Sequence, residues 1–192
     1  MSRWLAPLLV LALLLGGCTF EMTSESEPTT VVGNPICPDP AFMDLLPAEA
    51  VDYVELGMSI GIQIAFEELM GSVEDRMDEE ETGPAQTIYP RAMRLEQRNP
   101  PDDPTYANSL GFQKGLRIFL ADPGGTDLET VELGWAEDIP EYATTIKLTV
   151  DETLDIKPYI DARAATLSEP TLRSCNREDV TYVAVSTVQV EL

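Results

Sequence analysis

Histidine is absent from the 192-residue chain, and cysteine and tryptophan are scarce. Without histidine the chain has neither a Ser-His-Asp nor a Cys-His catalytic set, and it has no imidazole ligand for zinc. The three cysteines, Cys18, Cys37 and Cys175, are too few for a four-cysteine metal site. These absences exclude several large classes of enzyme, and we expect no cofactor.

Basic residues are also few. The chain has 12 lysines and arginines against 34 aspartates and glutamates, which gives a net charge of −22 at pH 7. A field of this sign repels nucleic-acid phosphates and anionic lipid headgroups. We therefore expect no nucleic-acid partner. A solvated acidic surface explains the charge without a specific ligand, and divalent cations or basic proteins are the alternative partners.

The N-terminal stretch carries the most specific pattern in the chain. Arg3 supplies one positive charge, and residues 4–15 are apolar throughout and mostly leucine. A short basic start, an apolar run and small residues before a cleavage site are typical of a secretory signal peptide. The run is shorter than the roughly 20 residues that a permanent membrane-spanning helix needs. The pattern predicts export with removal of residues 1–17.

The sequence that closes this stretch, Leu15-Gly16-Gly17-Cys18, resembles the lipobox of bacterial lipoproteins. In that family the cysteine thiol receives a diacylglycerol, a dedicated peptidase cuts before it, and the new amino group is usually acylated. The resemblance implies that Cys18 is the lipidated first residue of the mature protein. Thr19 after it is similar to the outer-membrane sorting pattern, so we expect a lipid-anchored envelope protein at the outer membrane. An ordinary signal peptide before an unmodified cysteine is the alternative.

Composition divides the rest of the chain into a tether and one folded domain. Residues 18–34 are rich in Ser, Thr and Glu with little to bury, which is typical of a flexible tether, although residues 30–32 could form a short strand. The domain is expected over residues 35–192. Its start is ambiguous, because a strand followed by a short helix around residues 66–78, or one long helix over 51–78, fits the pattern.

Strand patterns dominate the remainder. Apolar and polar residues alternate in several short segments, and the last segment is rich in β-branched and aromatic residues. The predicted strands cover residues 92–98, 116–120, 131–135, 146–150, 162–167 and 180–192, with a short further piece at 154–156 that ends before Pro158. Their spacing, with Pro and Gly between them, predicts a mainly β fold, an antiparallel β-sandwich. In pattern, residues 106–192 resemble the immunoglobulin-like modules of bacterial envelope proteins, but without the Cys-Trp-Cys trio of antibody domains.

Two pairs of aspartates are candidates for site chemistry. Asp122 and Asp127 bracket a Pro-Gly-Gly turn and could hold calcium, but a hairpin turn explains the same residues, so we expect no bound metal. Asp102 and Asp103 are adjacent, and neighbours on an extended strand point to opposite faces, which is unsuitable for an acid/base pair. Three aromatic residues could line a ligand cleft or belong to the core, namely Tyr89, Tyr106 and Trp135.

The remaining thiols, Cys37 and Cys175, are predicted to form a disulfide. With Cys18 lipidated they are the only free pair, and export places them in an oxidising compartment. A bridge would tie the entry of the domain to its last strand, which in the loop-entropy model is worth roughly 5 kcal/mol. Two separate thiols are the alternative.

These observations favour a non-enzymatic function. We expect a membrane-anchored binding or structural protein whose partner is an envelope protein, a glycan or a small ligand. A carboxylate-based or metal-assisted hydrolase is the alternative. Two or more carboxylates that converge in a concave pocket would favour the hydrolase.

Overall fold

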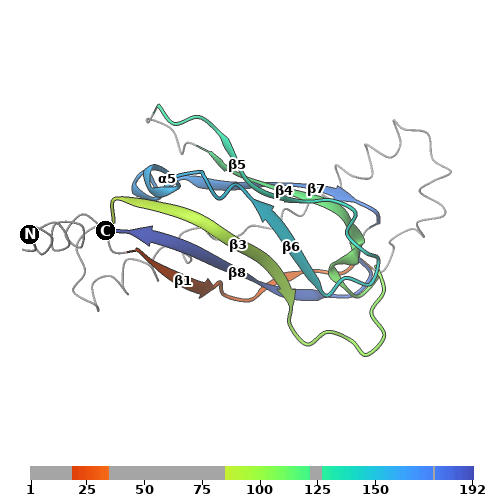
Figure 1. The fold of residues 1–192 in the computed structure, drawn as a ribbon. Helices are drawn as coiled ribbons and strands as arrows, with labels where there is room; N and C mark the ends of the chain where they lie inside the picture. Colours follow the sequence, from red (N-terminus) through yellow and green to blue (C-terminus); the bar gives the residue numbers. More distant parts are fainter. Residues whose placement is uncertain (1–18, 35–84, 122–126, 175) are drawn as a thin grey trace, which may run out of the picture.

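The computed structural model describes residues 19–34, 85–121, 127–174 and 176–192, and the regular structure in this part of the chain is mainly β-strand with almost no helix (Figure 1). Its elements are β1 (Thr19–Glu25), β2 (Thr29–Val31), β3 (Thr87–Gln97), the 3-10 turn η1 (Leu110–Phe112), β4 (Gln113–Ala121), β5 (Val131–Ala136), β6 (Thr145–Val150), helix α5 (Lys157–Asp161), β7 (Ala165–Leu172) and β8 (Val180–Glu191). The mainly β prediction is confirmed.

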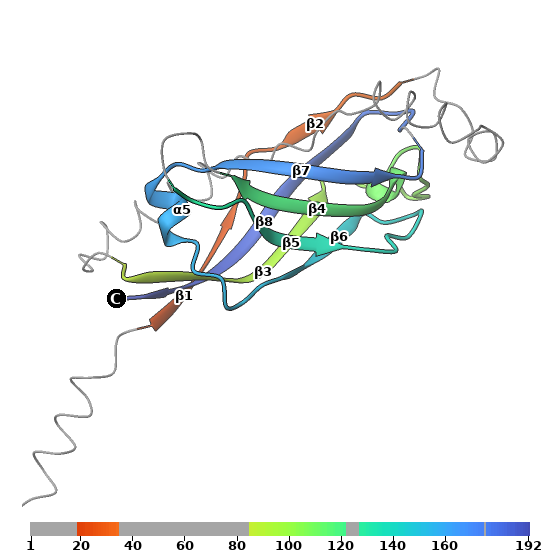
Figure 2. The ribbon, with the colours of Figure 1, turned by 90° about the horizontal axis from the view of Figure 1, so that it is seen from above.

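All strand pairs are antiparallel, and the strands follow the order β1-β8-β3-β6-β5-β4-β7, with β2 also paired to β8. Strands β1, β8 and β3 form one layer and β5, β4 and β7 the other, with β6 between them (Figures 1 and 2). β6 pairs with β5 only through Gly134–Val150 and Trp135–Thr149. Gly134 permits this close approach, because a Cβ there would lie 3.0 Å from the carbonyl oxygen of Thr149.

The apolar side chains of the two layers form a common core. Its largest fully buried members include Leu95, Leu116, Ile118, Leu120, Leu133, Ile156 and Tyr182. In β3, Met93 and Leu95 are buried, whereas Arg94 and Glu96 are partly exposed and form an ion pair with each other. The alternation predicted for this strand is confirmed. Full burial of each aliphatic side chain contributes about 1.5–3 kcal/mol to folding.

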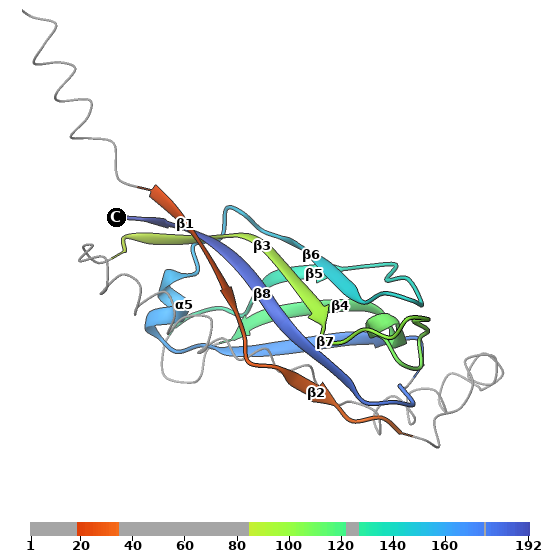
Figure 3. The same ribbon diagram turned by 90° about the horizontal axis from the view of Figure 1, so that it is seen from below.

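The prediction of a flexible tether over residues 18–34 is wrong for most of that segment. β1 pairs with the C-terminal half of β8, from Thr19–Glu191 to Glu25–Val185, and β2 pairs with its beginning (Figure 3). The composition misled because β1 is an edge strand in which only Met22 is fully buried. Thr and Ser suit such a half-exposed strand, and the backbone pairing does not depend on apolar side chains. The short strand expected at residues 30–32 lies at 29–31.

Further boundaries differ from the expectation. The strand expected at residues 162–167 lies at Ala165–Leu172. The strand expected from residue 92 begins at Thr87. Its first part contains Pro90, which the strand accommodates at a bulge between Pro90 and Ala92. The short strand piece expected around residues 154–156 is a loop that leads into α5. Pro158 had indicated a break, but it lies in the first turn of the helix, where the missing N–H costs nothing. The helix expected around residues 66–78 and its long-helix alternative lie outside the described residues.

One end of the molecule is defined by the start of β1, the end of β8 and the start of β3. Thr19 and Thr87 both lie opposite Glu191, on either side of β8. Helix α5 lies at the same end (Figure 1). The backbone N–H of Ile156, just before the helix, donates to the carbonyl of Ile88 at 2.8 Å. We call this the Thr19 end.

Candidate functional site

An open groove of about 590 Å³ lies beside β5 and the end of β6. It is lined by Val131, Glu132, Trp135, Val150, Asp151, Glu152 and Leu154. The groove exists because β5 and β6 pair only through two residues each. Beyond that contact the chain leaving β6 turns at Asp151, and the beginning of β5 runs beside β4 alone.

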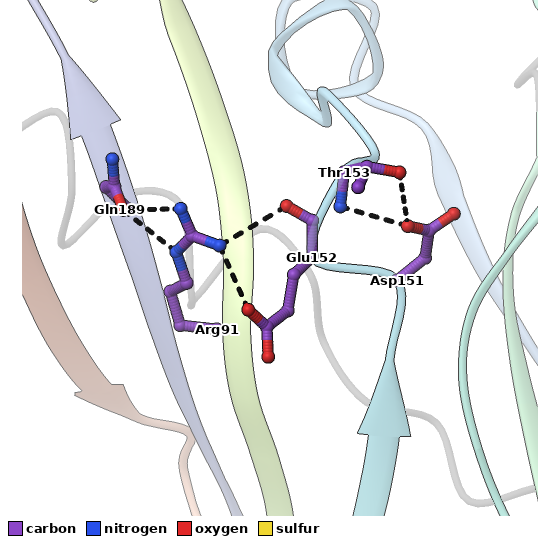
Figure 4. Close-up of polar contacts among 5 residues, drawn as sticks. All are labelled: Arg91, Asp151, Glu152, Thr153 and Gln189. Carbon is purple, nitrogen blue, oxygen red and sulfur yellow. Dashed lines mark hydrogen bonds and ion pairs between the residues drawn. The ribbon is translucent and has the colours of Figure 1, made fainter.

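The turn at Asp151 is held by its own side chain. Asp151 Oδ1 accepts hydrogen bonds from the Thr153 hydroxyl at 2.6 Å and from the Thr153 backbone N–H at 2.9 Å (Figure 4). Both bonds lower the pKa of Asp151 from its ordinary value, and the bond from the Thr153 hydroxyl has the larger effect. The carboxylate therefore stays ionised at neutral pH and fixes the direction of the loop.

Glu152 is tied to the opposite layer through Arg91. Arg91 Nη1 lies 3.1 Å from Glu152 Oε2, and Arg91 Nε donates to Gln189 Oε1 at 2.9 Å (Figure 4). The guanidinium also lies over the ring of Tyr89, 6.0 Å from the centroid. Arg91 falls at the bulge of β3, which interrupts the regular alternation and directs the side chain toward the 151–154 loop.

Glu132 and Trp135 form the β5 side of the groove. Arg117 on β4 lies opposite Trp135 in register, and its Nε is 3.5 Å from Glu132 Oε1. Trp135 is only partly buried, and it lines the groove. The groove thus combines three carboxylates, two bordering guanidinium groups, one indole and three aliphatic side chains.

This donor set does not resemble a metal centre. Among the described residues, no group of three or more acidic or cysteine side chains is arranged to hold a metal ion. The groove instead combines carboxylate acceptors, the indole of Trp135 and aliphatic side chains, with the guanidinium groups of Arg91 and Arg117 beside two of the carboxylates. Such a mixture of an apolar lining with a few polar groups is typical of small-ligand sites.

Only some of the site residues predicted from the sequence lie at or near the groove. Trp135 lines the groove and Tyr89 lies behind Arg91, whereas Tyr106 is in the loop that follows β3. Asp102 and Asp103 are exposed in that same loop, and Asp127 is exposed before β5. Asp122, Cys18, Cys37 and Cys175 lie outside the described residues.

Sequence reasoning did not identify Glu132, Asp151 and Glu152 as site residues. Glu132 is distant in sequence from the other two, and only the register of β5 and β6 brings them together. A partial signal was present, because an Asp followed two residues later by a Thr at the end of a strand is typical of a side-chain-capped turn.

No protein-family model matches the chain, and no curated protein is significantly similar to it. In the ranges that the structure describes, no helix is both long enough and apolar enough to span a bilayer. The functional assignment therefore depends on the groove and on the N-terminal motif.

Proposed function

We propose that this protein is a lipid-anchored, acidic protein of the cell envelope that binds a neutral glycan in the groove beside β5. The observation that carries the proposal is the combination of a partly exposed indole, Trp135, with three carboxylates and two arginines around one open groove. An aromatic face packs against the C–H surface of a sugar ring, while carboxylate and guanidinium groups hydrogen-bond to its hydroxyls.

The charge arrangement favours a neutral polyhydroxyl ligand over a cation. Glu132 and Glu152 each already lie beside an arginine, at 3.5 and 3.1 Å, so an incoming cation would compete with a built-in one. A sugar hydroxyl can donate to the remaining carboxylate lone pairs and accept from a guanidinium N–H at the same time. Phosphorylated or carboxylated glycans are disfavoured by the net charge of −22.

The location follows from the N-terminal motif. Leu15-Gly16-Gly17-Cys18 supports cleavage before Cys18 and lipidation of its thiol, and Thr19 supports sorting to the outer membrane. The two antiparallel layers around one core support an immunoglobulin-like β-sandwich as the scaffold.

A carboxylate-based hydrolase is the second candidate, because Glu132, Asp151 and Glu152 all line one groove. Glycoside hydrolysis needs one carboxylic acid whose pKa is raised so that it can donate a proton. The pKa of Asp151 is shifted in the opposite direction by its bonds to Thr153. This carboxylate is therefore a hydrogen-bond acceptor and not the proton donor of such a pair.

Trp135 gives a direct test. The only other tryptophan, Trp4, lies in the segment removed with the signal peptide, so the fluorescence of the mature protein reports on the groove alone. We would titrate the mature protein with cellobiose, maltose and lactose and follow Trp135 emission. At least one disaccharide should change the emission saturably, and calorimetry should give the same dissociation constant.

Matched variants separate the groove from the rest of the surface. Glu152→Gln and Asp151→Asn should weaken binding by roughly 10- to 100-fold, because each loses a charge-assisted hydrogen bond. Glu96→Gln, which changes an ion-paired glutamate outside the groove, should bind as wild type. No response to any of the three sugars, or equal losses in all three variants, would refute the glycan site. Release of monosaccharide during the titration would establish the hydrolase instead.

A further inference from the structure

We infer that the groove is held at the membrane surface, where it takes a neutral saccharide carried on a lipid of the same membrane. The inference rests on the proposed function, because it assumes lipidation of Cys18 and a glycan ligand. It goes further by fixing where the ligand comes from. A saccharide in a distant envelope polymer would need a site far from the anchor.

The first step is that no spacer separates the anchor from the fold. β1 begins at Thr19, the residue directly after Cys18, and Thr19 is already paired with Glu191. Consecutive Cα atoms are 3.8 Å apart. A flexible tether over residues 18–34 would have allowed a separation of roughly 20–24 Å between lipid and domain. The strand removes that freedom, so the Thr19 end of the sheet lies against the bilayer.

The second step is that the groove lies near the Thr19 end. Glu21 on β1 and Tyr89 on β3 both lie opposite Gln189 of β8, and Gln189 accepts a hydrogen bond from Arg91. Tyr89 is displaced from Thr19 by two residues in the strand direction and by two strand spacings across the sheet. These two displacements together place Tyr89 roughly 12 Å from Thr19. Arg91 then reaches Glu152 on the rim of the groove at 3.1 Å.

Hydrogen bonds between backbone groups support the same placement. Ile88, which lies opposite Val190, accepts from the N–H of Ile156, and its own N–H donates to Asp155 Oδ1 at 3.1 Å. The loop that forms one wall of the groove is therefore attached to the rows of the sheet nearest the anchor. The opposite end of β8, at Val180, is about 40 Å away along a 12-residue strand.

These distances match a ligand at the bilayer surface. The polar headgroup layer adds about 5–8 Å on each side of the hydrocarbon core, and a sugar headgroup extends beyond it. Anionic headgroups are repelled by the net charge of −22. The groove is therefore suited to the uncharged sugar of a glycolipid and not to an acidic lipid.

The position can be tested without any ligand, because Trp135 reports on its own distance from the membrane. We would reconstitute the lipidated protein in phosphatidylcholine vesicles with dansyl-labelled headgroups and measure energy transfer from Trp135. A variant with 20 Gly and Ser residues inserted between Cys18 and Thr19 is the control. Transfer should be efficient in the wild type and at least threefold lower in the spacer variant. Equal transfer in the two proteins would overturn the inference.

The ligand source is tested with the same three disaccharides, free in solution or linked to dioleoylglycerol in the protein's own vesicles. Confinement to one surface raises the effective concentration, so the linked sugar should bind at least 10-fold more tightly in the wild type. The spacer variant should keep its affinity for the free sugar and lose most of this gain. Binding of the free sugar without a gain would refute the membrane source and leave the glycan site intact. If the sugar binds in neither form, the glycan site itself is refuted. The position of the groove relative to the membrane is decided separately, by the energy-transfer measurement.

Discussion

The backbone N–H of Asn34 donates a 2.9 Å hydrogen bond to the carbonyl oxygen of Asn176. Next to it, the N–H of Gly33 donates to Asp179 Oδ1 at 2.8 Å. A Cβ at Gly33 would lie 2.6 Å from the carbonyl oxygen of Arg177, so only glycine allows this approach. The segment that leads toward Cys37 is therefore packed against the segment that contains Cys175.

This contact supports the predicted disulfide. Cys37 is three residues beyond Asn34, a reach of about 10 Å, and Cys175 adjoins Asn176, so a Cα separation within about 7 Å is attainable. We predict no reactive thiol in the denatured, unreduced mature protein. Reduction, or Cys37→Ser, should lower the free energy of unfolding by about 2–5 kcal/mol. Titration of two thiols per chain with a thiol reagent would contradict the bridge.

Met22 tests whether residues 19–25 are part of the fold. Its side chain is 4% exposed in β1, so Met22→Ala should lower the free energy of unfolding by about 2–3 kcal/mol. The neighbouring Glu21→Ala changes an exposed side chain and should have an effect of less than about 0.5 kcal/mol. Denaturant unfolding of both variants measures the difference. If neither variant differs from the wild type, residues 19–25 form a tether after all.

An apolar substitution of Gln113 should stabilise the protein. The side chain is completely buried at the start of β4, and neither its Nε2 nor its Oε1 has a hydrogen-bond partner. A buried unsatisfied amide costs about 1–3 kcal/mol, so Gln113→Met, of similar volume, should raise the free energy of unfolding by about 1 kcal/mol. The same substitution at Gln189 removes the acceptor for Arg91 and should destabilise. We therefore expect the free energy of unfolding to rise for Gln113→Met and to fall for Gln189→Met. A fall in both variants would contradict the prediction.

The ionisation of Asp151 should make the stability of the folded protein depend on pH in the acid range. The Thr153 hydroxyl and backbone N–H lower its pKa below the ordinary value of 3.8, which the unfolded chain restores. Asp151 therefore favours the folded state above the unfolded pKa, and this contribution disappears as the pH falls through the lower folded value. Thr153→Val should raise the pKa of Asp151 in the folded protein, measured by NMR titration of its carboxyl carbon. An unchanged pKa would show that the hydroxyl is not the main cause.

The regular strands could be predicted because their side chains alternate. In β6, Ile146 and Leu148 are buried between exposed neighbours, and β8 is rich in β-branched residues. The pattern failed where few apolar residues are involved. β1 buries one side chain completely, and α5 has only five residues, so neither contains enough periodicity to be recognised.

The groove was only partly predictable for a different reason. Trp135 could be selected as an aromatic candidate from its residue type, but Glu132 and Glu152 come together through register. The contact between β5 and β6 is limited to two residues each, and the bulge that directs Arg91 lies on a third strand. Sequence alternation predicts which face a side chain occupies, but it does not predict where two strands diverge.

The anchor at Cys18 is the central claim, because the location of the protein and the membrane position of the groove both depend on it. The most direct measurement is the intact mass and N-terminal sequence of the protein purified from bacterial membranes. We predict a chain that begins at Cys18, carries two or three acyl chains and enters the detergent phase on phase separation. Cys18→Ser should lose the acyl mass and remain uncleaved or leave the detergent phase. A wild-type chain that begins elsewhere, carries no acyl mass and stays in the aqueous phase would contradict the claim.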